Sequence, residues 1–92
     1  MLSKNIYDMR VSFGWTQVQL AHKLNVTKQT VSNWENDNIQ PSIDMLVKLS
    51  KIFNTSTDYL LGLTPTNAIN VDGLPSEFVA HIVQVIDDYK SK

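Results

Sequence analysis

The sequence predicts an all-α fold, with a compact domain of five helices followed by one additional C-terminal helix. Three observations lead to this prediction. Apolar residues recur at intervals of three and four along most of the chain, as they do on one face of an α-helix. Ser or Thr precedes most of these stretches at a capping position, and Asn or Gly follows most of them. The 92 residues, 42% of them apolar, suffice for one small hydrophobic core.

Composition narrows the class of protein. The chain contains no cysteine, which excludes disulfides and thiolate metal sites and predicts a cytoplasmic protein. No apolar run reaches the roughly 20 residues that a membrane span requires, and residues 1–10 lack the apolar stretch of a signal peptide.

The net charge of −1 is unevenly distributed along the chain. Residues 1–64 carry six Lys or Arg against five Asp or Glu, whereas residues 65–92 carry two against four.

The first predicted helix lies before Gly14, which is expected to end it, and Ser3 is expected to cap it. Trp15 follows in the link to the next helix. Apolar residues recur along this first helix at spacings of four, three and four, which predicts that they form one face buried in the core. These residues are Leu2, Ile6, Met9 and Phe13.

Two short helices and a tight corner are predicted for residues 17–36. Thr16 and Gln19 have the spacing of a capping box at the start of the first helix. Asn25 is expected to end that helix with a positive φ, and Thr27 is expected to cap the second one. The apolar residues of both helices should pack across the corner, which Val26 fills. They are Leu20, Ala21, Leu24, Val31 and Trp34.

The opposite face of the second short helix is polar. Its residues can form hydrogen bonds and include a single charge, whereas a solvated helix face more often alternates Glu and Lys. Such a face suits the edges of base pairs, where Lys pairs with guanine and Gln or Asn pairs with adenine. We call it the polar strip, and it consists of Lys28, Gln29, Ser32, Asn33 and Asn36.

Two further helices complete the predicted domain. Pro41 prevents a continuous helix, and Ser42 is expected to cap a helix over residues 43–53 that Asn54 ends. Ser56 is expected to cap a short helix over residues 57–61, which Gly62 stops. The residues expected to face the core from these two helices are Leu46, Val47, Leu49, Ser50, Phe53, Tyr59, Leu60 and Leu61.

The remaining chain divides into a linker, residues 64–74, and a last helix within residues 75–92, with Ser76 as its expected cap. Alternation over residues 68–71 indicates a short extended segment. A single helix cannot bury an apolar stripe by itself, so this helix must pack on its own domain (residues 1–63) or on a second copy. We predict the second arrangement, with a dimer interface formed by Phe78, Ile82, Ile86 and Tyr89, beside Val79 and Val83.

Residues 6–62, about two thirds of the chain, resemble the Cro and phage-repressor family of helix-turn-helix regulators, also called the xenobiotic-response-element family. The residues that carry the resemblance are Thr16-Gln17, Ala21, the run Val31 to Asn36, Pro41-Ser42 and the run Asp58 to Gly62. Asn25 departs from the family, which often has Gly there, and Asp37-Asn38 replaces a common Gly-Lys type of turn. The resemblance implies a lambda-repressor-like fold.

The resemblance also implies a sequence-specific transcriptional regulator, a repressor that binds a palindromic DNA operator as a homodimer. The recognition helix would be residues 28–36. Base contacts are expected from Lys28, Gln29 and Asn33, with Ser32 and Thr27 as further candidates. Phosphate contacts are expected from Gln17, at a helix N-terminus, and from Asn36, Asn38 and Gln40. By similarity, Arg10 and Glu35 form a structural ion pair; the rival interpretation is that Arg10 contacts a phosphate.

Other interpretations are also open to the sequence. A protein-interaction module on the same fold, such as an antitoxin or antirepressor acting through the C-terminal helix, is the alternative function. No catalytic constellation is visible in the sequence, so we expect no enzyme and no cofactor. His22 and His81 lack further ligands at suitable spacing, so we expect no metal site. Trp15 and Trp34 are interpreted as core residues rather than base-stacking platforms.

Overall fold

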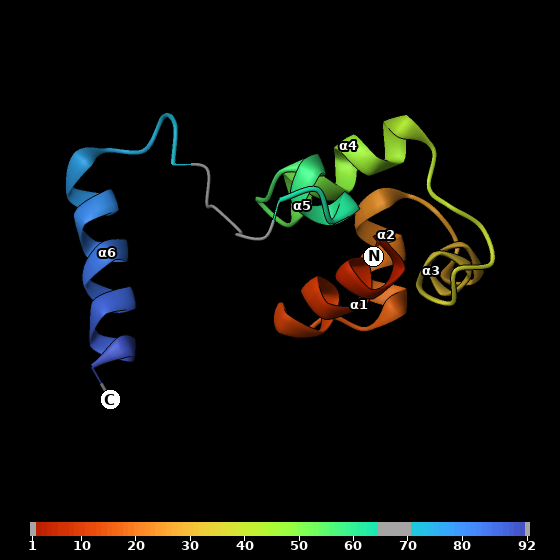
Figure 1. The fold of residues 1–92 in the computed structure, drawn as a ribbon, viewed down its shortest axis with the longest axis horizontal. Coiled ribbons are helices and arrows are strands. Elements are labelled where there is room, and N and C mark those ends of the chain that lie inside the picture. Colours follow the sequence, from red (N-terminus) through yellow and green to blue (C-terminus); the bar gives the residue numbers. More distant parts are fainter. Residues whose placement is uncertain (1, 65–70, 92) are drawn as a thin grey trace.

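The computed structural model describes residues 2–64 and 71–91, and within these residues it contains six helices and no strand. The all-α prediction is therefore confirmed. The first five helices form one compact unit, the head domain, and the sixth stands apart from it (Figure 1). The helices are α1 (Leu2–Ser12), α2 (Gln17–Leu24), α3 (Lys28–Glu35), α4 (Ile43–Ile52), α5 (Thr57–Leu61) and α6 (Ser76–Lys90).

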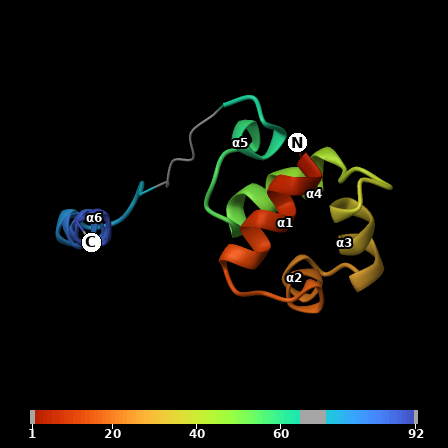
Figure 2. The same cartoon turned by 60° about the horizontal axis from the view of Figure 1, so that its bottom comes forward.

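The core of the head domain receives side chains from all five of its helices, which surround one centre (Figure 2). Asn5 joins the two ends of the domain, since its Nδ2 donates hydrogen bonds of 3.1 Å to the carbonyl oxygens of Tyr59 and Leu60 in α5. The buried apolar residues are Ile6, Leu20, Ala21, Leu24, Val31, Trp34, Leu49, Phe53 and Leu60.

Four predicted helix caps are present. Thr16 and Gln19 form a complete capping box at α2, in which each side chain accepts a backbone N–H of the other residue. The hydroxyls of Thr27, Ser42 and Ser56 each accept the backbone N–H three residues further on, at the starts of α3, α4 and α5. These bonds satisfy N–H groups that have no partner inside the helix.

The predicted helix ends also have the expected backbone conformation. Asn25 has φ 57° and Asn54 has φ 52°, which is the left-handed region that Asn tolerates better than most residues. Gly62 has φ 79° at the end of α5. Each of these residues lets the chain turn sharply while its backbone N–H still bonds to the preceding helix.

Several details differ from the sequence predictions. Ser3 lies inside α1, which begins at Leu2, and α4 ends at Ile52 with Phe53 as its cap residue. Val47 and Leu61 are exposed. At about 100° per residue, Val47 lies on nearly the opposite side of α4 from the buried Leu49, and Leu61 lies about 100° around α5 from the buried Leu60.

The aromatic side chain of Phe13 is also exposed in part, but it still packs. Its ring lies 4.7 Å from that of Trp15 and 5.6 Å from that of Phe53, measured between centroids. The two rings of Trp15 and Phe53 stack at 5.9 Å. This aromatic cluster closes the corner between α1, α2 and α4.

The C-terminal helix departs from its predicted cap. Ser76 is the first residue of α6, and Pro75, whose φ of −60° suits the position, is the N-cap residue without a side-chain cap. Helix α6 buries none of its residues. Part of the linker, including most of the predicted extended segment, lies outside the described residues. No helix within residues 2–64 and 71–91 is long and apolar enough to cross a membrane.

The core predicts a contrast between two residues of α4. Leu49 is fully buried, so Leu49→Ala should lower the free energy of unfolding by about 2–5 kcal/mol through lost contacts and a cavity. Ile43 is 81% exposed, and Ile43→Ala should change it by about 0.5 kcal/mol or less. Chemical denaturation of both variants measures the difference. Similar losses in both would mean that α4 is not packed as described.

Candidate nucleic-acid interface

The corner between α2 and α3 fixes the angle at which α3 is presented. Asn25 turns the chain at the end of α2, and the backbone N–H of Val26 donates a 2.9 Å hydrogen bond to the carbonyl of Ala21. The small side chain of Ala21 lies in the buried core with the apolar residues of α3, Val31 and Trp34. The two helices therefore cross closely and form a rigid corner.

The polar strip lies on the outside of α3, as predicted. Lys28 and Gln29 are exposed, whereas Ser32 and Asn33 are partly exposed. The helix is one residue shorter than predicted, since it ends at Glu35 and Asn36 is its cap residue. Thr27 uses its hydroxyl to cap the helix. The five candidates for base contact are thus the cap residue and four residues spread over the first six positions of α3, namely residues 27–29, 32 and 33.

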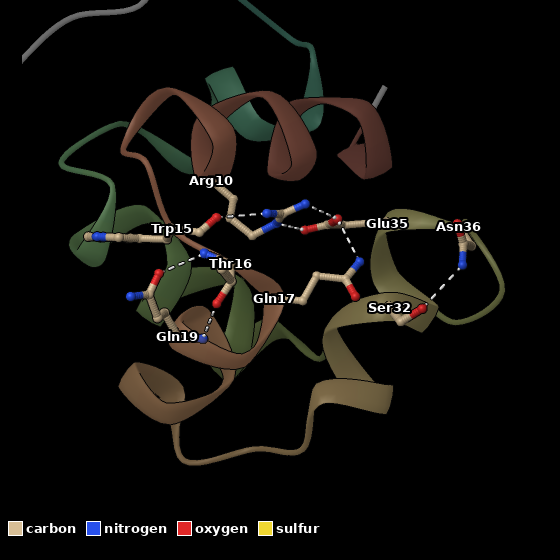
Figure 3. Close-up of polar contacts among 8 residues, drawn as sticks. All are labelled: Arg10, Trp15, Thr16, Gln17, Gln19, Ser32, Glu35 and Asn36. Carbon is tan, nitrogen blue, oxygen red and sulfur yellow. Dashed lines mark hydrogen bonds and ion pairs between the residues drawn. The ribbon is translucent and has the colours of Figure 1, made fainter.

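Two hydrogen bonds order the polar strip internally. The Nε2 of Gln29 donates to the Oδ1 of Asn33 at 3.0 Å, one helical turn away. The Nδ2 of Asn36 donates to the hydroxyl of Ser32 at 3.2 Å (Figure 3). The first bond uses one N–H of Gln29 and leaves the carbonyl oxygen of its amide available. The amide of Gln29 therefore presents its carbonyl oxygen as an acceptor beside its second N–H as a donor. This is the combination that adenine requires.

A buried ion pair fastens α3 to α1. The Nε and Nη2 of Arg10 donate to the two carboxylate oxygens of Glu35 at 2.6 and 3.0 Å (Figure 3). The side chains of Arg10 and Glu35 are only 11% and 4% exposed. The Nη1 of Arg10 also donates to the carbonyl of Trp15 at 2.7 Å. These bonds leave the Arg10 guanidinium directed into the protein, as the ion-pair interpretation requires.

The hydrogen bonds to Glu35 raise the pKa of Arg10 above its ordinary value. An arginine is protonated at any physiological pH, so the positive charge of the pair is permanent. Within the described residues, every buried side-chain nitrogen and oxygen has a hydrogen-bond partner. The pair is therefore fully satisfied despite its burial.

Gln17 joins this network, which the sequence did not reveal. Its Nε2 donates to the Oε1 of Glu35 at 3.1 Å, so α2 is tied to the same carboxylate as α1 (Figure 3). Gln17 is the first residue of α2 and remains partly exposed. It therefore has a structural contact beside the phosphate contact expected of it.

The loop after α3 places Asn38 and Gln40 at the surface. The backbone N–H groups of Asn38 and Ile39 both donate to the carbonyl of Asn33, at 2.9 and 3.3 Å. Asp37 has φ 60°, a left-handed conformation that the sequence analysis did not predict. Asp37-Asn38 stands where the family commonly has a Gly-Lys type of turn, and Gly is typical of positive φ. This difference is the sequence signal that could have indicated the left-handed conformation of Asp37.

The remaining candidates have packing roles or no ligand-like surroundings. Trp34 is buried, and Trp15 stacks on Phe53 with the Lys23 ammonium 4.5 Å from its ring centroid. His22 lines an open depression beside these residues, and His81 is exposed on α6. In the described part of the chain no three His, Cys, Asp or Glu residues are grouped so as to hold a metal ion.

Two helices crossing at a fixed corner, with a polar outer face on the second, define a helix-turn-helix unit. Comparisons with known proteins agree. The sequence model of the helix-turn-helix family matches residues 6–60. The transcriptional regulator ImmR of Bacillus subtilis (strain 168) is 37% identical over 87 residues, which cover 95% of this chain and 68% of ImmR. The chain therefore belongs to the helix-turn-helix family of DNA-binding transcriptional regulators.

Solved structures support the same fold. A transcriptional regulator from Listeria innocua superposes with a TM-score of 0.66 at 22% identity, over 99% of this chain and 94% of that one. The SinR protein/SinI protein complex contains a chain that superposes with a TM-score of 0.61 at 22% identity, over all of both chains. At this identity the likeness establishes the fold alone.

The buried ion pair generates a matched prediction. Glu35→Gln should lower the free energy of unfolding by about 3–5 kcal/mol, because Arg10 then keeps a buried charge without a counter-ion. Asp37→Asn removes the same charge from an exposed loop and keeps a residue type that accepts positive φ, so about 0.5 kcal/mol or less is expected. Thermal melts compare the two. Equal, small shifts would show that the Arg10–Glu35 pair does not hold the domain together.

Proposed function

We propose that this regulator is a repressor that binds a palindromic operator as a homodimer and inserts α3 into the major groove. The observation that carries the proposal is the polar strip of α3, which is exposed, almost free of charge and fixed from behind by the buried Arg10–Glu35 pair. A helix held in this way can enter the groove without reorganisation. The protein then acts by binding, with neither catalysis nor a cofactor.

Specificity is assigned to polar residues of α3 and its cap. The amide of Gln29, supported by Asn33, is suited to a bidentate contact with adenine, and the ammonium of Lys28 is suited to guanine. Ser32 and Thr27 flank these residues and can contact either a base or the adjoining backbone. This arrangement would read neighbouring base pairs in each half of a palindrome.

Affinity is assigned to neutral groups as much as to charges. The head domain carries a net charge of only about +1, so few cations are available for phosphates. Gln17 lies at the N-terminus of α2, where backbone N–H groups attract anions. Asn36 caps the C-terminal end of α3, and Asn38 and Gln40 lie in the loop that follows. All three residues are exposed and can donate amide hydrogens to phosphate oxygens.

Dimerisation is assigned to α6. Its strip of Phe78, Ile82, Ile86 and Tyr89 is without cover from the head domain in the described chain (Figure 1). Pairing two such strips buries apolar area that one chain leaves in water. Two-fold pairing also suits a palindrome, because the two recognition helices must then lie about 34 Å apart, one turn of DNA.

A second function is favoured by the same exposed helix. The SinR protein/SinI protein complex shares this fold, and its name describes an assembly of two proteins. The apolar face of α6 is equally a surface on which another protein could dock, as in an antitoxin or antirepressor. This module would use α6 for its partner and leave the polar strip of α3 without a role.

Selection of DNA sites from a random library with the purified chain separates the two functions. A regulator should recover one palindromic site, and its affinity should fall steeply between two salt concentrations, since phosphate contacts release counter-ions. A pool that stays random, with binding that does not depend on salt, would overturn the proposal and favour the protein-interaction module.

Two substitutions on α3 should alter sequence discrimination. Gln29→Ala and Asn33→Ala should each lose about 1–3 kcal/mol of preference at particular base pairs, because a base-edge hydrogen bond is removed. Asn38→Ala, the control, should weaken binding by a similar factor at every operator variant, because a phosphate contact carries no sequence information. Titration against a panel of singly substituted operators measures both effects. Unchanged preferences in both α3 variants would show that this helix does not read the bases.

Removal of α6 should separate folding from dimerisation. A chain truncated after Thr64 keeps the entire core of the head domain and should fold, but it should sediment as a monomer and bind a palindrome much more weakly. Sedimentation and a DNA titration of both lengths provide the comparison. A full-length chain that is monomeric at high micromolar concentration would rule out α6 as the dimer element.

A further inference from the structure

Two open depressions on the surface of the head domain share Lys23 as a lining residue. One of them, with a volume of about 300 Å³, lies between the C-terminal halves of α2 and α4. The other, of about 410 Å³, lies on the outer side of α2 and includes Trp15 and Val18. We call the first one the basic depression, and its lining residues are Lys23, Leu24, Asn25, Lys48, Lys51 and Ile52.

The unpaired positive charge of the head is concentrated around the basic depression. Two of the six cationic side chains in residues 1–64 form ion pairs, with Asp8 and with Glu35. In the described chain no ion pair joins the other four to a carboxylate, and three of those four line the depression. Its described lining contains no Asp or Glu, since Asp44, one turn before Lys48 on α4, lies outside it. A nearly neutral head therefore has a strongly positive site.

The positions of these lysines in their helices do not account for the cluster. Lys23 and Lys51 lie in the last turns of α2 and α4, where the helix dipole favours a cation. Lys48 lies about one turn earlier and has no such role. Like charges near one another repel even where solvent screens them. A bound anion would remove that repulsion, so the cluster indicates a ligand with negative charge.

The floor of the basic depression is apolar. Leu24 is only 3% exposed, and Ile52 packs partly buried against the same core. On one side Lys23 is held over Trp15, with its ammonium 4.5 Å from the ring centroid, and Trp15 stacks on Phe53. A ligand would thus meet cations around the rim and hydrocarbon beneath them. A phosphodiester backbone offers charge alone, whereas a protein segment can offer carboxylates and an apolar side chain together.

The basic depression lies away from the residues assigned to DNA. Gln17 begins α2, and Lys23 lies six residues later, about 9 Å further along the helix axis. Gln40 precedes α4, whereas Lys48 and Lys51 lie in the second half of that helix. Both helices therefore have their proposed phosphate contacts at the N-terminal end and their lysines toward the other end. DNA bound along α3 would leave the depression open.

We propose that the basic depression binds an acidic segment of another protein, with carboxylates on the three lysines and one apolar side chain on the floor. Complementary charge defines the partner, since it attracts an acidic segment and repels a basic one. The separation of this site from DNA rests on the proposed function, whereas the binding of an acidic segment does not. The head would then hold an operator on α3 and an acidic protein on α2 and α4 at the same time.

An NMR titration of the isotope-labelled, full-length chain with a peptide tests the site without DNA. The probe is a short peptide with blocked ends, in which one Leu is flanked on each side by two Glu residues. The amide signals of Leu24, Lys48 and Ile52 should shift and saturate, while those of the polar strip should not move. Replacing Glu by Gln, or Leu by Ser, in the peptide should each weaken binding by about tenfold or more, because rim and floor both contribute.

Two matched variants test the lysines. Lys48→Gln with Lys51→Gln should weaken binding of the peptide by about tenfold or more, because two of the three cations are removed. The control, Lys4→Gln with Lys90→Gln, removes the same net charge from exposed positions outside the depression and should stay within about twofold of the parent. Circular dichroism of each variant verifies the fold.

Three results of these titrations would overturn the proposal. The first is equal affinity of the parent and both variants for the peptide. The second is equal affinity of the parent for the Glu and Gln peptides. The third is a set of shifts confined to the polar strip, since the peptide would then replace DNA phosphates on α3.

A duplex carrying the selected palindrome separates the two sites. The affinity for the peptide should be the same with and without saturating duplex, and the Lys48/Lys51 variant should bind the duplex as the parent does. A variant that binds DNA more weakly, with a salt slope lower by about 2, would show that the lysines contact phosphates and would overturn the proposal. Failure to select any palindrome would count against the proposed function alone.

The acidic C-terminal part of the same chain is the remaining competitor for the site. Asp87→Asn with Asp88→Asn should leave the affinity for the peptide within about twofold of the parent, because these carboxylates are exposed on α6. A variant that binds the peptide at least about tenfold more tightly would overturn the proposal, since the chain would then occupy the depression with its own carboxylates.

Discussion

The position of α3 depends on one buried ion pair. Arg10 of α1 and Glu35 of α3 share two hydrogen bonds, and the link residue Trp15 and the α2 residue Gln17 bond to the same pair. Burying two charges costs desolvation energy, which their mutual attraction offsets only when every donor and acceptor is satisfied. The network meets that condition. The Arg10–Glu35 pair therefore contributes mainly to orientation. The apolar core brings α1, α2 and α3 together, and the hydrogen bonds to Glu35 fix how these helices lie relative to one another.

Local features of the fold were predictable from the sequence because their causes are local. A Thr or Ser before a helix bonds to an N–H three residues away, and an Asn after a helix accepts a positive φ, so Thr16, Thr27, Asn25 and Asn54 identified the helix boundaries. The contacts of the candidate site were harder to predict. Arg10 and Glu35 are 25 residues apart, and their pairing was expected only through resemblance to a family. The bond from Gln17 to Glu35 had no sequence signal, since an amide at a helix start is equally suited to water, a phosphate or a carboxylate.

The contrast between the head domain and α6 separates two kinds of stability. The head closes its core within one chain, and Asn5 completes that closure by bonding to two carbonyls of α5. Helix α6 has regular geometry but no buried residue, so its apolar side chains gain little from burial within the described chain. The head can thus fold without a second chain, whereas the apolar side of α6 is left in water within the described chain. In the proposed dimer, the burial of that side would depend on how much protein is present.

The hydrogen bond between Gln29 and Asn33 has an evolutionary consequence. Two side chains that hold each other lose less conformational entropy when they meet a ligand than two independent ones, and they act as a unit. In a protein that reads DNA through them, replacement of either amide also releases the other. New operator preferences would then arise through paired changes one helical turn apart, and single changes would weaken recognition before they redirect it. Divergence among such regulators should therefore appear as covariation between these two positions.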